Sequence, residues 1–172
     1  MHELSEMACN VFVIAEAAIP VGTADMAKAQ AKRLNMSLIL TGTDPEQGNH
    51  HAGVGIMVRA PTVLKELGMS STKGEDAQAM GRMLKGAVQQ INGDLWNIIG
   101  LYGWSGADKD VDRARRTNAL VEAARVEEAA TGHVPTYITG DLNAQIDTLP
   151  ALKGDRWLDR RGQHYAPEAR LA

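Results

Sequence analysis

The sequence has few of the features that mark secreted proteins, membrane-spanning proteins or strongly basic nucleic-acid-binding proteins. Its one cysteine, Cys9, excludes a disulfide within the chain and fits a reducing compartment; we expect it to be a small buried hydrophobe. No apolar run approaches the ~20 residues that cross a bilayer, and the acidic first residues do not resemble a signal peptide. The net charge is -3, whereas proteins that grip a nucleic-acid backbone usually carry a basic excess. We therefore expect an intracellular protein, cytoplasmic or nuclear, that is not held in a membrane.

The composition is that of one ordinary globular domain. Of the 172 residues, 44% are hydrophobic and 23% are charged, and no repeat or Pro/Gly-rich linker divides them. We therefore predict a single domain over residues 1–172. Short apolar, β-branched runs predict strands at residues 10–15, 37–41, 53–59, 62–67 and 134–139. Two further runs, at 83–91 and 95–102, flank an Asn-Gly-Asp turn that favours a tight antiparallel hairpin.

Helical patterns occupy two segments. One runs over residues 23–34, where Thr23 is expected to cap the helix. The other runs over residues 111–131 and stops at Gly132. Residues 42–52 and 68–79 are predicted to be surface loops, and the chain beyond Pro150 is polar and is expected to be irregular. Hairpins mixed with strand–helix units predict an α/β sandwich in place of a regular βαβ repeat.

Polar residues follow three of the predicted strands: Glu16, Tyr102, and the pair Asp141 and Asn143. Sheet ends hold such side chains rigidly at an open edge. Two carboxylates, Glu16 and Asp141, offer the hard oxygen ligands that Mg²⁺ prefers, and Asn143 is suited to donate to a phosphoryl oxygen. Taken singly, each has a simpler interpretation. A Glu after a strand is commonly a solvated strand end, a lone Tyr commonly packs half-buried, and Gly-Asp-x-Asn is commonly a turn.

Taken together, these segments resemble the endonuclease/exonuclease/phosphatase family. Residues 138–144, Ile-Thr-Gly-Asp-Leu-Asn-Ala, resemble its Gly-Asp-(Phe/Leu)-Asn-Ala signature. Residues 13–16 resemble its strand ending in Gln-Glu, and residues 52–59 its Gly-Gly-Val-(Ala/Gly)-Ile-Leu-Val strand. Gly81-Arg82, the hairpin and residues 101–104 resemble its central strand pair ending in Tyr-x-Pro. The segments stand in the family's order over roughly residues 11–150, and the resemblance implies the family's two-sheet α/β sandwich.

The resemblance also implies roles for the four residues. Glu16 would coordinate Mg²⁺ or Mn²⁺. Asp141 would share in that metal site and orient or deprotonate the attacking water. Asn143 would hold the scissile phosphate or steady Asp141, and the Tyr102 hydroxyl would contact the phosphate. The implied reaction is hydrolysis of a phosphate ester, with DNA or RNA among the possible substrates, by in-line attack on phosphorus. Domains of this family are frequently fused to reverse transcriptases in mobile elements.

The chain departs from the family pattern towards both ends. The family's first strand carries a metal-binding asparagine, and Asn10 is not placed to be that residue. Ala15 stands where Gln is usual, and Trp104 where Pro is common. The family's closing Ser-Asp-His segment has no counterpart, because His164 lacks the preceding Asp and comes too soon after Asn143. We therefore expect a truncated sandwich without the family's first and closing strands, with activity that is weak or lost. The alternative is an inactive remnant or a binding module of the same fold.

Other polar residues are expected to lie in solvated loops or on a solvated helix face, with no role in a site. They are His50, His51, Asp159, Arg113, Arg115 and Arg116.

Overall fold

Two β-sheets form the centre of the protein. The computed structural model describes residues 9–46, 51–145, 149–152, 157–158 and 164–165. The first sheet has the order β1 (Val11–Ala15), β3 (Val54–Arg59), β2 (Met36–Leu40), with β3 antiparallel to both neighbours. The second has the order β4 (Val63–Glu66), β5 (Met83–Gln89), β6 (Leu95–Tyr102), β7 (Thr136–Asp141). Its pairs are antiparallel except β6–β7, which is parallel.

The inner faces of the two sheets pack on each other. Val54, Ile56 and Val58 of β3 are fully buried against Leu84 of β5 and Ile98 of β6. The intervening Met57 is also fully buried, but it faces the opposite side of the first sheet. Strand β3 is therefore covered on both faces, which explains why its sequence is a continuous apolar run and not an alternating one.

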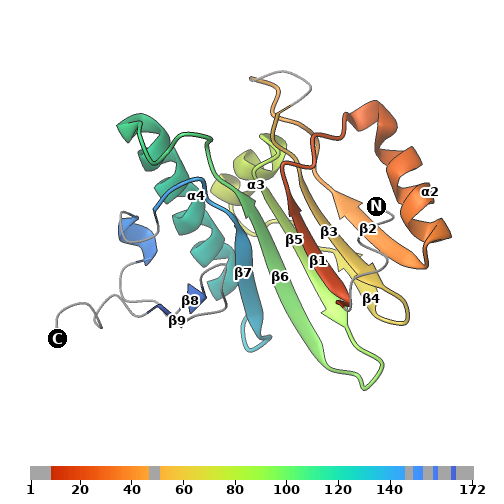
Figure 1. Ribbon diagram of the computed structural model, residues 1–172. Coiled ribbons are helices and arrows are strands. Elements are labelled where there is room, and N and C mark those ends of the chain that lie inside the picture. Colours follow the sequence, from red (N-terminus) through yellow and green to blue (C-terminus); the bar gives the residue numbers. More distant parts are fainter. Residues whose placement is uncertain (1–8, 47–50, 146–148, 153–156, 159–163, 166–172) are drawn as a thin grey trace.

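Helices cover the two outer faces. Helix α2 (Ala24–Arg33) packs Ala31 against Met36 and Met57 of the first sheet, after the short 3-10 turn η1 (Val21–Thr23). Helices α3 (Thr72–Ala79) and α4 (Val111–Ala129) cover the second sheet, and α4 packs Leu120 and Ala124 against that face. Figure 1 shows α2 and α4 on opposite sides of the paired sheets. The predicted two-sheet α/β sandwich is confirmed.

The predicted hairpin is also present. Strands β5 and β6 pair from Met83↔Leu101 to Gln89↔Leu95. In the turn between them, Gly93 has a φ of 89°, and the Asp94 backbone N–H donates to Asn92 Oδ1 at 3.1 Å. Glycine accepts this left-handed conformation without a steric penalty, so the turn forms where the sequence places it.

The prediction of a surface loop at residues 68–79 was wrong, because α3 occupies most of that segment. Ser71 caps the helix by accepting a hydrogen bond from the Gly74 N–H at 3.1 Å. The buried residues of α3 are small, Gly74 and Ala77, so α3 lies close against α4. A Cβ at Gly74 would come 2.5 Å from a carboxylate oxygen of Glu127. The helix has almost no apolar stripe, which is why its sequence resembles a loop.

Three smaller expectations were also wrong. Thr23 makes no side-chain cap for α2, because its hydroxyl donates to the Pro20 carbonyl at 2.9 Å. Cys9 is exposed, not buried. Beyond Pro150 the chain forms the 3-10 turn η3 (Pro150–Leu152) and a short antiparallel pair, β8 (Trp157–Leu158) with β9 (His164–Tyr165). His164 stands in β9, and the expectations for His50 and Asp159 fall outside the described residues.

A buried ion pair ties the outer helices to the second sheet. Lys85 Nζ on β5 lies 3.0 Å from Glu127 Oε2 on α4, and both side chains are almost fully buried. Glu127 also accepts hydrogen bonds from the Ser70 N–H at 2.8 Å and the Ser71 hydroxyl at 2.7 Å. Burial raises the pKa of Glu127, but the hydrogen bonds from Ser71, Ser70 and Lys85, together with the Lys85 charge, outweigh it and leave that pKa below its ordinary value.

Strand β1 is attached along one edge. Among the described strands its neighbour in the sheet is β3 alone. The Arg59 N–H donates to the Asn10 carbonyl at 2.8 Å, so Asn10 is a hydrogen-bonded position of the antiparallel ladder. Hydrogen-bonded positions alternate with positions whose N–H and C=O groups point away from the partner strand. The backbone groups of Val11, Val13 and Ala15 therefore point away from β3.

No helix in the described ranges is long and apolar enough to cross a bilayer.

Candidate active site

The site forms where β1, β6 and β7 end. Tyr102 and Asp141 are register partners at the ends of the parallel strands β6 and β7. Ile138 of β7 packs on the outer helices, so by strand alternation Asp141 lies on the opposite, inner side. Tyr102 also belongs to the inner cluster. The first sheet lies on that side, and Glu16 follows its strand β1.

Glu16 lies near enough to Tyr102 to affect its pKa. Tyr102 is 3% exposed, which makes it more buried than the half-buried packing residue that the sequence alone suggested. Its hydroxyl lies 3.0 Å from Ser105 Oγ. Burial raises the pKa of Tyr102 and is the largest effect. The hydrogen bond with Ser105 lowers that pKa, the nearby Glu16 carboxylate raises it and the Arg82 charge lowers it, and the net pKa lies above its ordinary value. The phenol therefore stays protonated at neutral pH and can donate a hydrogen bond.

Asp141 and Asn143 form a turn that also ties β7 to β6. Asp141 Oδ1 accepts the Asn143 backbone N–H at 3.0 Å, and Asn143 Nδ2 donates to the Gly103 carbonyl at 3.2 Å. The turn interpretation of Gly-Asp-x-Asn is therefore confirmed, and the turn places Asp141 and Asn143 at the end of β7. Asn143 and Glu16 both have left-handed backbone conformations, with φ of 51° and 54°. Such conformations away from glycine are uncommon and concentrate at functional sites.

Arg82 packs against Tyr102, and the sequence analysis assigned it no role in the site. It is 1% exposed, and its guanidinium lies 5.0 Å from the Tyr102 ring centroid and 4.8 Å from that of Trp104. One terminal nitrogen donates to the Gly103 carbonyl at 3.0 Å, and the other to Asp44 Oδ2 at 2.9 Å. Gly103 O thus receives both Arg82 and Asn143, which fixes the ends of β6 and β7 relative to each other.

The donors at this site fit a hydrated divalent ion better than a metal cage. Glu16 is exposed and Asp141 is partly buried, so both carboxylates are reachable from solvent. Within the described residues, no three or more His, Cys, Asp or Glu side chains group closely enough to enclose a metal. Mg²⁺ keeps several waters and is commonly held by one or two carboxylates plus substrate oxygens. Glu16 with Asp141 matches that chemistry.

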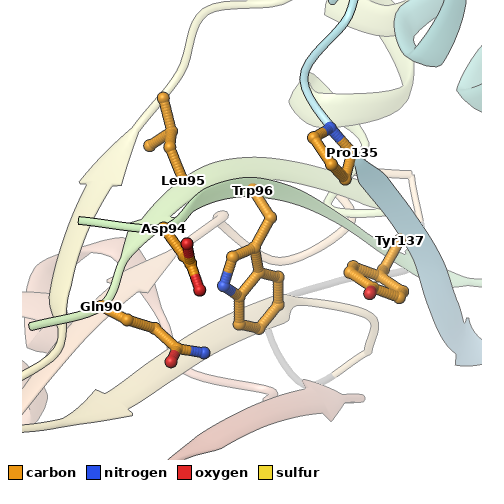
Figure 2. Close-up of a pocket in the computed structure, with 6 residues that line it drawn as sticks. All are labelled: Gln90, Asp94, Leu95, Trp96, Pro135 and Tyr137. Atoms are coloured by element: carbon orange, nitrogen blue, oxygen red, sulfur yellow. The ribbon is translucent and has the colours of Figure 1, made fainter. Parts of the chain in front are cut away.

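Two cavities flank opposite ends of β6. One, of about 550 Å³, lies at the hairpin end and is lined by residues that include Trp96 and Tyr137. Figure 2 shows these two rings beside each other, with centroids 5.3 Å apart and an edge-to-face geometry. Six strand steps of about 3.3 Å place it roughly 20 Å from Tyr102. The other, of about 560 Å³, is lined by Trp104 and Ser105, next to the site. The second cavity therefore adjoins Tyr102, and the first does not.

Structural comparison identifies the fold. The chain is similar to a 3'-5' exonuclease from Neisseria meningitidis, with a TM-score of 0.55 and 17% identity over 81% of this chain and 50% of that one. The protein has the endonuclease/exonuclease/phosphatase fold. A Neisseria 3' phosphatase bound to a product DNA hairpin matches with a TM-score of 0.58 and 18% identity, over 85% of this chain and 53% of that one. Beta toxin from Staphylococcus aureus matches with a TM-score of 0.56 and 16% identity, over 90% of this chain and 64% of that one.

Sequence comparison adds no closer relationship. No family model matches the chain, and no curated protein matches it. The chain spans about half the length of the first two solved chains it resembles. The fold implied by the sequence resemblance is confirmed, whereas the catalytic and metal-binding roles expected of Glu16, Tyr102, Asp141 and Asn143 remain predictions.

Proposed function

We propose that this chain is a metal-dependent phosphoester hydrolase. The observation that carries the proposal is the convergence of the Glu16 carboxylate, the Tyr102 hydroxyl and the Asp141–Asn143 turn at one end of the two sheets. The endonuclease/exonuclease/phosphatase fold supports it, since proteins of this fold include a nuclease and a phosphatase. A carboxylate for a hard cation, a neutral phenol and a carboxylate–amide pair are the parts that in-line attack on phosphorus requires.

Each residue would have a distinct task. Glu16, with Asp141, would hold Mg²⁺ or Mn²⁺, which when bound neutralises charge on the phosphoryl oxygens. The Tyr102 hydroxyl would donate a hydrogen bond to one of those oxygens. Asp141 Oδ1 is occupied by the turn, so Oδ2 would serve both tasks of this residue: it would share in the metal site, and it would orient the attacking water and accept its proton. Asn143 steadies the turn through Gly103.

A second candidate is a module that binds phosphate esters without turnover. The sparse donor set favours it, since the described residues offer no cluster of three metal-binding side chains. Both candidates predict binding of a phosphate ester, and only the first predicts hydrolysis.

A hydrolysis assay separates the two candidates. The purified chain would be incubated with bis(p-nitrophenyl) phosphate and with labelled oligonucleotides, in Mg²⁺, in Mn²⁺ and in EDTA. We expect activity that requires the metal and that falls about 10²–10⁴-fold in Asp141→Asn, the usual contribution of a general base. Glu16→Gln should raise the metal concentration needed for half-maximal activity. Asp76→Asn, an exposed acid on α3, is the matched control and should change neither quantity.

Two outcomes would overturn the proposal. Equal rates in wild type and Asp141→Asn would assign the activity to a contaminant. No hydrolysis by a wild-type protein that melts cooperatively would leave the binding module as the function.

A further inference from the structure

A cavity of about 560 Å³ opens beside the candidate site, between the segment after β6 and the first turns of α4. Ser105 joins the two, because it lines the cavity while its Oγ lies 3.0 Å from the Tyr102 hydroxyl. A group bound in the cavity would therefore be the direct neighbour of a phosphate at Tyr102. The wall also contains His51, Trp104 and, from α4, Arg113 and Arg116.

The two acids in the wall, Asp110 and Asp112, are already occupied. Asp110 caps α4, with Oδ1 accepting the backbone N–H groups of Asp112 at 2.9 Å and Arg113 at 3.1 Å. Its other oxygen lies 3.7 Å from Arg113 Nε. Asp112 lies 3.0 Å from Arg115. Each carboxylate thus has a cationic or N–H partner of its own, so neither presents an unpaired negative charge to the cavity.

The two arginines in the wall differ in their pairing. Arg113 is held in place, since its Nη1 donates to the Ser105 carbonyl at 2.6 Å. Arg116 forms no ion pair within 4 Å of an acid in the described ranges, although the Arg113 backbone N–H and, more weakly, the Arg116 charge lower the pKa of Asp110. It is exposed and lines the cavity, so its five N–H donors are available to an oxyanion. Of the two arginines in the wall, Arg116 is therefore the one whose guanidinium can bind a ligand without breaking a hydrogen bond or a close ion pair.

We propose that this cavity binds the phosphate adjacent to the scissile one, through Arg116 with Arg113 at its side, and that the substrate is a nucleic-acid strand. The inference rests on the proposed function, because it names the substrate class of the same site. An isolated phosphate ester would leave Arg116 unused, whereas a strand carries a second phosphate one nucleotide from the first.

The cavity recognises the backbone and not a base. The Trp104 side chain is 8% exposed and packs under Arg82, so it offers no free ring face for stacking. The net charge of -3 also argues against a long basic track. We therefore expect the cavity to contact about one flanking phosphate. Removing that contact should make the slope of log K against log salt concentration shallower by about 0.7 for a single strand.

Thymidine dinucleotides test the subsite by binding alone. The three probes are the dinucleoside monophosphate, which has one phosphate, and its forms with an added phosphate at the 5' or the 3' end. We expect one of the two-phosphate forms to bind wild type about ten-fold more tightly than the monophosphate, the usual scale of a charged hydrogen bond. Arg116→Ala should abolish that difference.

Lys73→Ala is the matched control. It removes the same single positive charge from an exposed position on α3 that does not line the cavity and is not paired with an acid of its wall. It should keep the ten-fold preference. Equal binding of all three probes by wild type, or equal effects of Arg116→Ala and Lys73→Ala, would overturn the subsite and show that any affinity comes from general surface charge.

Kinetics distinguish this inference from the proposed function. Arg116→Ala should lower kcat/KM for an oligonucleotide about ten-fold and leave bis(p-nitrophenyl) phosphate, which has one phosphate, unchanged. Equal losses on both substrates would refute the subsite while the hydrolase stands. Absence of turnover on both by wild type would refute the hydrolase, and the dinucleotide binding would then decide the subsite by itself.

Discussion

Arg82 is expected to be among the costliest residues in the protein to replace. The change Arg82→Met keeps much of the volume but leaves the Asp44 carboxylate, 2% exposed, without its partner at 2.9 Å. Removing one member of a buried ion pair typically costs about 3–5 kcal/mol, because the other charge stays buried and unpaired. The contacts with the Tyr102 and Trp104 rings are lost as well. For a domain of this size, the expected drop in Tm is roughly 8–15 °C.

A double-mutant cycle isolates the pair from the packing. Asp44→Asn removes the buried negative charge, so Arg82→Met in that background no longer strands a carboxylate. We therefore expect the double variant to be more stable than the sum of the single losses predicts, with a coupling of about 2 kcal/mol. Urea unfolding followed by tryptophan fluorescence gives all four free energies. If the losses add within about 0.5 kcal/mol, the ion pair does not stabilise this site and the reasoning fails.

Two further predictions concern the junction of α3, α4 and β5. Because hydrogen bonds and Lys85 hold the pKa of Glu127 below its ordinary value, the stability it contributes is present above the unfolded pKa of about 4.3 and is lost as pH falls through the folded pKa. Glu127→Gln should therefore be less stable at pH 7 and lose less stability than wild type between pH 7 and pH 3, as measured by urea unfolding; a parallel loss would contradict this. Gly74→Ala should lower Tm, although Gly→Ala usually stabilises a helix interior by about 1 kcal/mol, because the new Cβ would meet the Glu127 carboxylate; a higher Tm would show that the carboxylate moves aside.

The strands were predictable because their signals are local. Strand β3 is a continuous apolar run, and the β5–β6 hairpin is marked by a turn that accepts positive φ at Gly93. Helix α3 was missed for the opposite reason. Its stability comes from close contact with α4 through Gly74 and Ala77, and no apolar periodicity announces such a contact.

The candidate site divides in the same way. Glu16, Tyr102 and Asp141 were recognisable as polar residues at strand ends, and the structure brings those strand ends together. Arg82 was not recognisable, because its partner Asp44 lies 38 residues away in the sequence and nothing local separates a buried arginine from an exposed one. The short Gly81-Arg82 segment before β5 was the one available signal, and it suggested a position in the fold but no function.

The single-ladder attachment of β1 links the stability of that strand to the chemistry of the site. Glu16 follows a strand that has one neighbour among the described strands, so its position depends on a strand with fewer restraints than β6, which is paired on both sides. Regions with few restraints open locally at low free-energy cost. A ligand of Glu16 binds only when β1 is docked, so opening of β1 lowers the apparent affinity. Binding of that ligand in turn stabilises the docked strand against opening.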